Sequence, residues 1–169
     1  MGHIRPNTSP FASSVVLVKK KDGTLRMCID YRALKMTNLK NRYPTPSINE
    51  PMDKMRGSDL FSNIDLRSGY HQIKVRDQDI PKTAFRCHYV QFEFLVMPFG
   101  LTNAPTTFRS CTDHIFCGKL RKFVLVLFDD IIMYRRTWEE HLQHIETILH
   151  ILEEKKFYAK LSKCEFGLT

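Results

Sequence analysis

The chain has 169 residues, of which 43% are hydrophobic and 26% are charged, values typical of a soluble globular protein with one domain, or one domain and part of a second. No apolar run approaches the roughly 20 residues that a membrane span requires, and the N-terminal segment lacks the apolar core of a signal peptide, so we expect an intracellular protein with no membrane partner. The formal net charge of +8 favours a polyanionic partner such as nucleic acid.

The five cysteines are odd in number and irregularly spaced, and no two of them form a Cys-x-x-Cys pair. The sequence therefore predicts neither a disulfide framework nor a zinc ribbon. Reduced thiols that are mostly packed inside the fold are the better interpretation. The cysteines are Cys28, Cys87, Cys111, Cys117 and Cys164.

The N-terminal part of the chain predicts a hairpin with a cationic tip. Ile4–Pro10 contains two prolines and several turn-forming residues, so we expect it to be extended and irregular. Two predicted strands follow, at 14–18 and 24–31, joined by the basic turn 19–23. The lysines of this turn, together with Arg26, are consistent with an anion-binding site and equally with a solvated turn.

The next segments alternate between polar stretches and short predicted elements. Residues 32–42 are polar with weak periodicity, and a short helix capped by Ser47 is expected at 47–55. After a turn that begins at Arg67, residues 71–75 are expected to be extended. Residues 83–86 and 90–96 predict a second hairpin.

Residues 59–66 form a predicted strand with two distinct faces. Phe61, Asn63 and Asp65 share one face, because alternate residues of a strand point the same way. The other face carries Leu60, Ser62, Ile64 and Leu66. Asp65 therefore stands at the end of a buried strand.

Two longer helices are expected in the second half of the chain. Thr102 or Asn103 caps the first, which has Pro105 in its first turn and ends at Gly118. The second spans 138–156, with an apolar stripe formed by Leu142, Ile145, Leu149 and Leu152 and widened by Ile148 and Ile151. His141 and His144 lie on one side of this helix, where they could ligate a metal, but a solvated face is the better interpretation because no third ligand is near. The tail, residues 159–169, is polar.

Two adjacent carboxylates, Asp129 and Asp130, lie between two strongly apolar runs, 123–128 and 131–134. Each run reads as a buried strand, so the acids occupy the turn of a hairpin. Two ionised carboxylates beside a hydrophobic sheet need a neutralising cation, and a hard divalent ion suits oxygen ligands. Ordinary turn chemistry, in which Asp is common, explains the pair equally well at this point.

The order of elements predicts an α+β fold with a split βαβ sheet. Such a sheet brings the end of one central strand beside the tip of a neighbouring hairpin, and Asp65 would then meet Asp129. Three converging carboxylates suit Mg²⁺. Two such ions activate a hydroxyl and stabilise a leaving pyrophosphate, which is the chemistry of nucleotidyl transfer.

These features belong to a set of ordered blocks, and the chain resembles the fingers and palm of reverse transcriptases from long-terminal-repeat retrotransposons of the gypsy (Ty3) type. The resemblance covers nearly the whole chain. Each block alone is modest, and their number and order make the resemblance specific. The blocks are Ile4–Pro10, Val18–Gly23, Arg26–Arg32, Phe61–Gln72, Lys82–Phe85, Phe94–Pro105, Phe128–Ile131 and Leu161–Gly167.

The resemblance implies a right-hand polymerase palm, with a ferredoxin-like antiparallel sheet and helices on one face, plus a β-rich fingers subdomain. It implies fingers at about 1–46 and 70–98 and palm at about 47–69 and 99–160, within a single reverse transcriptase domain that lacks thumb, connection and RNase H. Asp65, Asp129 and Asp130 become the catalytic metal ligands, with the backbone of Leu66. Two Mg²⁺ ions, for which Mn²⁺ could substitute, are the expected cofactors.

The resemblance also assigns a nucleotide pocket and a template-primer site. Tyr70 is the implied steric gate that would clash with a ribose 2′-OH, although the residue alone suggests an ordinary core aromatic. The implied triphosphate and pocket residues are Lys20, Arg26, Arg67, Ser68, Gly69, Phe99 and Gly100. The region near template and primer includes Met97, Pro98, Asn103, Pro105, Leu127 and Phe128.

The implied activity is RNA-directed DNA polymerisation, which adds deoxynucleoside triphosphates to a primer on an RNA or DNA template. The chain would be part of a larger polyprotein with protease, RNase H and integrase. The alternative is a weak or inactive remnant that only binds nucleic acid. Leu127 favours it, because an aromatic residue is usual there; the other departures from the family pattern are Ser14, Lys35 and Arg135.

Overall fold

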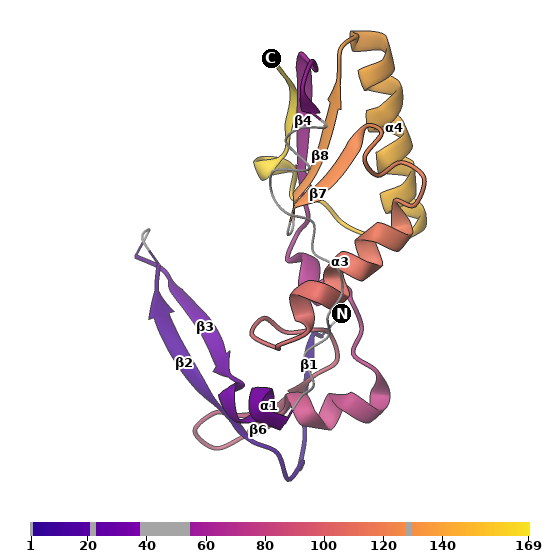
Figure 1. Ribbon diagram of the computed structural model, residues 1–169. Coiled ribbons are helices and arrows are strands. Elements are labelled where there is room, and N and C mark those ends of the chain that lie inside the picture. The colour runs from indigo at the N-terminus through magenta and orange to yellow at the C-terminus, as the bar shows by residue number, and fades with distance from the viewer. Residues whose placement is uncertain (1, 21–22, 38–54, 128–129) are drawn as a thin grey trace. The chain divides into compact units, whose positions relative to one another are not determined.

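The computed structural model describes residues 2–20, 23–37, 55–127 and 130–169. The predicted helix at 47–55 lies outside the described residues except for Met55. The chain divides into two compact units, Met1–Asn41 with Tyr70–Ala104 (unit 1) and Arg42–Gly69 with Pro105–Thr169 (unit 2). Figure 1 labels the elements of both units.

Unit 1 contains a five-stranded sheet in the order β1-β6-β5-β2-β3. β2 and β3 form the predicted antiparallel hairpin, in which Leu17 lies opposite Met27. The second predicted hairpin, β5–β6, is also confirmed. The strands are β1 (Ile4–Pro6), β2 (Ser13–Lys19), β3 (Leu25–Asp30), β5 (Phe85–Arg86) and β6 (Gln91–Phe94). The expectation of irregular structure at the N-terminus was wrong for β1, which pairs with β6.

A cluster of buried side chains holds this sheet to the segments around it. Ile29, Tyr31, Phe85 and Phe94 pack together, and the Tyr31 hydroxyl donates a hydrogen bond of 2.8 Å to the carbonyl oxygen of Thr83. Burial of these aromatic rings removes much apolar surface from water and stabilises unit 1. The base of the β2–β3 hairpin is therefore fixed in the core, although its outer half is exposed.

Three short helical segments of unit 1 were not expected from the sequence. α1 (Arg32–Thr37) follows β3 directly, and its first amide donates to Asp30 Oδ1 at 3.0 Å. The 3₁₀ segments η1 (Gly69–Gln72) and η2 (Asp77–Thr83) flank residues that we expected to be extended. The extended prediction for residues 71–75 was thus wrong at its start, and only Lys74 forms a strand-like bridge there, with Val96.

Unit 2 contains a four-stranded antiparallel sheet in the order β7-β8-β4-β9. β4 (Leu60–Asp65), β7 (Val124–Leu127) and β8 (Asp130–Arg135) confirm the predicted strand and acid-bearing hairpin. Along β4 the buried and half-buried residues alternate as the sequence indicated, since Ser62 and Ile64 are buried. The predicted α+β fold is confirmed.

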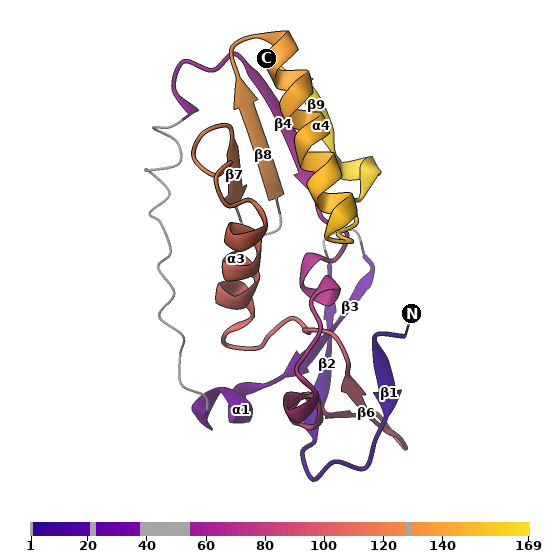
Figure 2. The ribbon, with the colours of Figure 1, turned by 90° about the vertical axis from the view of Figure 1, so that its right-hand side faces the viewer.

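Both predicted helices of unit 2 are present. α3 (Ala104–Ile115) buries Phe108 and Thr112, and Gly118 follows it with a left-handed φ of 80°. α4 (Trp138–Glu154) lies along one face of the sheet, as Figures 1 and 2 show. No helix among the described residues is long and apolar enough to cross a membrane.

The buried face of α4 agrees only in part with the predicted stripe. Ile148 and Leu152 of that stripe are buried, whereas Leu142 and Leu149 are 47% and 44% exposed, and His141 is buried in addition. The expectation that His141 is solvated was wrong, because its side chain is fully buried. His144 is half-buried and stacks on Phe123 with ring centroids 3.7 Å apart.

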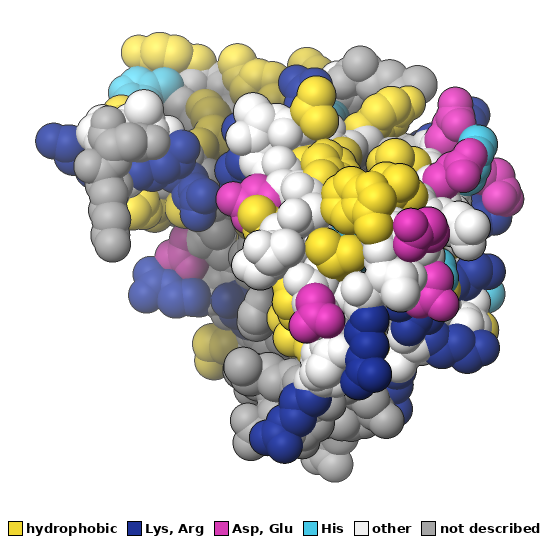
Figure 3. Space-filling model, turned by 90° about the horizontal axis from the view of Figure 1, so that it is seen from above, with side chains coloured by type: hydrophobic (Ala, Val, Ile, Leu, Met, Phe, Trp, Pro, Cys, Tyr) yellow, Lys and Arg dark blue, Asp and Glu magenta, His cyan; other side chains and the backbone are white. Residues whose placement is uncertain are grey.

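The C-terminal tail contains two elements that the sequence did not predict. It forms the 3₁₀ segment η3 (Leu161–Lys163) and the edge strand β9 (Glu165–Leu168), which pairs with β4. Trp138 of α4 packs over Gly167, where an added Cβ would lie 2.7 Å from the indole ring. Large exposed apolar residues of unit 2 include Trp138, Leu142, Phe166 and Leu168, and Figure 3 shows hydrophobic side chains gathered on the face seen there.

Candidate functional site

Asp65 and Asp130 lie directly opposite each other on the adjacent strands β4 and β8. Side chains of such cross-strand partners project from the same face, with Cβ atoms about 4.5–5.5 Å apart. The structure therefore brings together two of the three predicted carboxylates. Asp129 and Phe128 lie outside the described residues.

Asn63 adds an oxygen beside these carboxylates. Its side-chain Nδ2 donates a long hydrogen bond of 3.3 Å to Asp130 Oδ1. Its Oδ1 is buried and has no hydrogen-bond partner within the described ranges. A buried acceptor without a donor is costly unless a cation or another donor satisfies it.

A lysine from the C-terminal tail also reaches this site. Lys163 Nζ lies 3.0 Å from Asp65 Oδ2, and the Asp65 side chain is only 18% exposed. The Asp65 carbonyl oxygen accepts a hydrogen bond of 2.8 Å from the amide of Lys160. Both the side chain and the backbone of Asp65 are thus tied to the segment that leads into β9.

The oxygen atoms of Asp65, Asp130 and Asn63 fit a hard divalent cation. Like charges directly opposite on neighbouring strands repel, and carboxylate and amide oxygens are the ligands that Mg²⁺ prefers. No group of three His, Cys, Asp or Glu residues that could hold a metal occurs among the residues the structure describes, a set without Asp129. Leu66, the predicted backbone contact, is buried and forms a bridge with Ala159.

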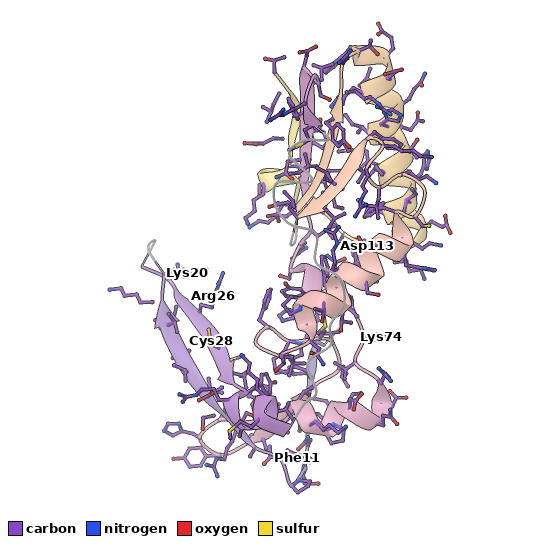
Figure 4. The ribbon with its side chains drawn as sticks, viewed as in Figure 1. Phe11, Lys20, Arg26, Cys28, Lys74 and Asp113 are labelled. Atoms are coloured by element: carbon purple, nitrogen blue, oxygen red, sulfur yellow. The ribbon has the colours of Figure 1, made fainter. Side chains whose placement is uncertain are left out.

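The predicted triphosphate-binding cations lie on the β2–β3 hairpin of unit 1. Lys20 and Arg26 are both exposed, and Figure 4 labels them on this hairpin. Arg26 lies opposite Val18, and the amide of Lys20 bonds to the carbonyl oxygen of Thr24 at 2.8 Å. The backbone of the hairpin therefore holds both cations in defined places.

The predicted steric gate belongs to an aromatic cluster. The ring of Tyr70 meets Phe99 edge to face, with centroids 4.8 Å apart, and His71 meets Phe99 at 5.2 Å. Burial, and then the neighbouring His3, lower the pKa of His71 below its ordinary value. Gly100 has a left-handed φ of 95°, so its backbone conformation favours glycine.

The remaining predicted pocket residues differ in exposure. Gly69 is buried, whereas Arg67 and Ser68 are exposed, and Ser68 has a left-handed φ of 51°. Among the predicted template-primer residues, the structure buries Met97 and Pro98, leaves Asn103 and Leu127 half-buried, and exposes Pro105.

Sequence reasoning missed Lys163 as a site residue. Its signal was the block Leu161–Gly167, which pointed to the family without indicating a role for the lysine. The contact with Asp65 spans 98 positions, so no local pattern could reveal it. The buried pair of Ser62 and His141, with Oγ and Nε2 2.7 Å apart, was missed for the same reason.

Comparison with known sequences shows the family of the chain. Residues 18–169 match the family described as reverse transcriptase (RNA-dependent DNA polymerase). The chain belongs to the reverse transcriptase family. The chain is 38% identical over 165 residues to the transposon Tf2-3 polyprotein of Schizosaccharomyces pombe. It is 39% identical over 170 residues to the retrovirus-related Pol polyprotein from transposon 297 of Drosophila melanogaster.

This reverse transcriptase domain covers only part of those relatives. The alignments include 98% of the chain but 12% of the Tf2-3 polyprotein and 16% of the transposon 297 polyprotein. The predicted likeness to retrotransposons of the gypsy type is confirmed, and the chain is a reverse transcriptase domain like those of retrotransposon polyproteins.

Solved structures show the same fold. The prototype foamy virus protease-reverse transcriptase matches with a TM-score of 0.89 and 25% identity, over 98% of this chain and 22% of that chain. A foamy viral protease-reverse transcriptase in complex with an RNA/DNA hybrid matches with a TM-score of 0.90 and 25% identity, over 98% and 22% of the two chains.

Proposed function

We propose that the chain is the catalytic part of an RNA-directed DNA polymerase, which adds deoxynucleotides to a primer 3′-OH by nucleotidyl transfer with two divalent ions. The observation that carries the proposal is the pairing of Asp65 with Asp130 in a chain of this family. The partners would be an RNA or DNA template with its primer and deoxynucleoside triphosphates.

Asp65, Asp129 and Asp130 would hold the metal ions, with the backbone of Leu66 close by. Two Mg²⁺ ions, or Mn²⁺ in their place, would activate the primer hydroxyl and stabilise charge on the leaving pyrophosphate. The strands of the protein would hold these metal ligands in position. β4 and β8 fix the carboxylates opposite each other, and the oxygen of Asn63 lies on the same face because it is two residues from Asp65.

The contacts to the nucleotide would come from residues that the family resemblance assigns to it. Lys20 and Arg26 would bind the triphosphate as exposed cations on the β2–β3 hairpin. The backbone of Arg67, Ser68 and Gly69 would lie beneath it. Tyr70 would exclude a ribose 2′-OH, because the edge-to-face contact with Phe99 fixes the ring.

Further roles follow the same assignment. Gly100 would line the nucleotide pocket beside Phe99. The template and primer would lie near Met97, Pro98, Asn103, Pro105, Leu127 and Phe128. The domain would act inside the cell, as part of a polyprotein with protease, RNase H and integrase.

Binding without catalysis is a second candidate function, and Leu127 is the observation that favours it. Leu127 pairs with Asp130 at the end of the hairpin, where the family usually places an aromatic residue. A smaller side chain there alters support for a primer terminus. The net charge of +8 would still attract nucleic acid.

Primer extension on an RNA template with Mg²⁺ distinguishes the two functions. Asp65→Asn keeps the size of the side chain and removes the negative charge that would hold the cation, so incorporation should fall to background. Asp59→Asn changes an exposed acid just before the same strand and should retain incorporation. Equal incorporation by wild type and Asp65→Asn would refute the polymerase proposal. Salt-dependent binding without incorporation by any form would support the binding module.

A further inference from the structure

An ion pair of α3 contacts the strand that leads into the acid-bearing hairpin. Arg109 Nε lies 2.9 Å from Asp113 Oδ1, one helical turn along, and each side chain is only 21% exposed. Nη1 of the same arginine donates a hydrogen bond to the carbonyl oxygen of Val126 in β7. Figure 4 labels Asp113 on α3. One guanidinium thus joins a helix to a strand.

The bond reaches the outer edge of the sheet. β7 is an edge strand, so every second backbone carbonyl points away from its partner β8. The carbonyl of Val124 faces outward and accepts a hydrogen bond of 2.9 Å from the amide of Arg121. The carbonyl of Val126, two residues on, faces the same way and is satisfied by Arg109. Val126 is 1% exposed, so water would not replace this donor easily.

The place of Val126 along β7 brings this hydrogen bond close to the acids. Val126 pairs with Ile131, and the next pair of the hairpin is Leu127 with Asp130. Asp130 in turn lies opposite Asp65. Arg109 therefore binds β7 at Val126, one residue before Leu127, the residue that pairs with Asp130.

We propose that Arg109 and Asp113 form a positioning pair that fixes the end of β7 and so sets the geometry of the metal ligands. Arg109 contacts the backbone, and Asp113 holds the guanidinium in place by charge. Neither residue touches metal or substrate in this role. The effect on metal ligands rests on the proposed function. The anchoring of the β7–β8 hairpin by Arg109 does not depend on that function.

The test combines metal binding with amide hydrogen exchange. Arg109→Met removes the donor and keeps the length of the side chain, and Asp113→Asn removes the charge that orients it. Mn²⁺ affinity, measured by electron paramagnetic resonance, should fall about 10-fold in Arg109→Met, as for loss of a group that supports metal ligands. Exchange of the amides of residues 124–127 and 130–133 should accelerate by about 10-fold, as for loss of a hydrogen bond to a charged group. Arg109→Lys, which retains one donor, should restore part of both.

Arg135→Met is the matched control, because Arg135 is a partly buried arginine at the other end of β8. It should leave Mn²⁺ affinity unchanged even where it lowers the thermal midpoint. Equal losses of stability in Arg109→Met and Arg135→Met, with unchanged Mn²⁺ affinity and exchange, would overturn the proposal. If the wild type binds no Mn²⁺, the polymerase proposal fails and the exchange measurement still decides whether Arg109 anchors the hairpin.

Discussion

Lys163 Nζ lies 3.0 Å from Asp65 Oδ2, although the two residues are 98 positions apart in the sequence. β4 ends at Asp65, and η3 delivers the lysine just before the chain enters β9. An ammonium group at this place offsets part of the repulsion between Asp65 and Asp130. The cation that the acids require is thus partly supplied by the chain itself.

Replacing Lys163 by Met should strengthen the binding of Mn²⁺ two- to fivefold, the factor expected for an exposed ion pair of about 0.5–1 kcal/mol. The metal then no longer competes with an ammonium group for Asp65. Titration followed by electron paramagnetic resonance measures the change. Lys160→Met is the control, since Lys160 contacts Asp65 through its backbone amide. Weaker binding in Lys163→Met would show instead that the lysine holds Asp65 in a ligand geometry.

Replacing Ser62 by Ala should destabilise unit 2 by about 1–3 kcal/mol, because the buried ring of His141 and the partly buried amide of Gly167 lose their partner. Ser62 Oγ lies 2.7 Å from His141 Nε2 and accepts a hydrogen bond of 3.0 Å from the amide of Gly167. Urea denaturation measures the free energy of unfolding. Ser162→Ala, at an exposed position, should change it little. Equal stability of the two variants would show that the buried hydroxyl contributes nothing.

Mild acid should destabilise the fold through His141. Burial lowers the pKa of His141 below its ordinary value, so the unfolded chain binds this proton more readily than the folded one. The neutral ring therefore stabilises the fold fully above the ordinary pKa, about 6.5, and this contribution is lost as the pH falls below that value. Thermal midpoints recorded between pH 8 and pH 5 should fall towards the acid end.

Comparison with two variants isolates this effect. His141→Asn should be less stable at pH 8 and show a flatter pH profile, since the titrating group is gone. His144 contributes in the same direction, because burial and then Arg135 lower its pKa. His150→Asn, which changes an exposed histidine of the same helix, is the control for loss of a histidine. A His141→Asn profile as steep as that of the wild type would contradict the prediction.

Replacing Gly167 by Ala should cost more stability than replacing Gly118. Both glycines have left-handed φ angles, 65° and 80°, so each substitution costs about 1–2 kcal/mol of backbone strain. At Gly167 the new methyl group would also lie 2.7 Å from the Trp138 ring, whereas nothing lies within 4 Å at Gly118. Denaturation of both variants, and of Gly167→Ala combined with Trp138→Leu, measures the difference. If the double substitution fails to reduce the cost of Gly167→Ala, the ring is not the cause.

The alternation and the apolar runs in the sequence predicted the strands that carry the acids. They did not predict which residues contact the acids. The alternation along β4 identified the faces of Asp65 and Ser62 correctly, because a strand with one buried face records that face in every second residue. The apolar runs on both sides of Asp129 and Asp130 likewise predicted the hairpin. These features depend on neighbours in sequence.

The incorrect or missing predictions concern residues whose contact partners are distant in the sequence. The apolar stripe of α4 is wide, so its sequence did not show whether the helix buries the side with Leu142 and Leu149 or the side with Ile148 and Leu152. His141 is buried beside Ser62, 79 positions away, whose Oγ lies within hydrogen-bond distance of its Nε2. The sequence of the tail did not reveal β9, because this strand is short and lies at the edge of the sheet, where exposed and charged residues are tolerated. The contact of Lys163 with Asp65 could not be predicted without β9, because the lysine lies just before that strand.

The central strand β4 forms its contacts late during synthesis. Asn63 bonds to Asp130 across 67 positions, and Ser62 bonds to Gly167 across 105. As β4 leaves the ribosome, neither neighbouring strand has been made, and loop closure over such lengths is slow. Both edges of this central strand thus stay unpaired until β8 and β9 are made, and unpaired strand edges favour association with other nascent chains. The order of translation therefore leaves β4 exposed to aggregation until the C-terminal strands emerge.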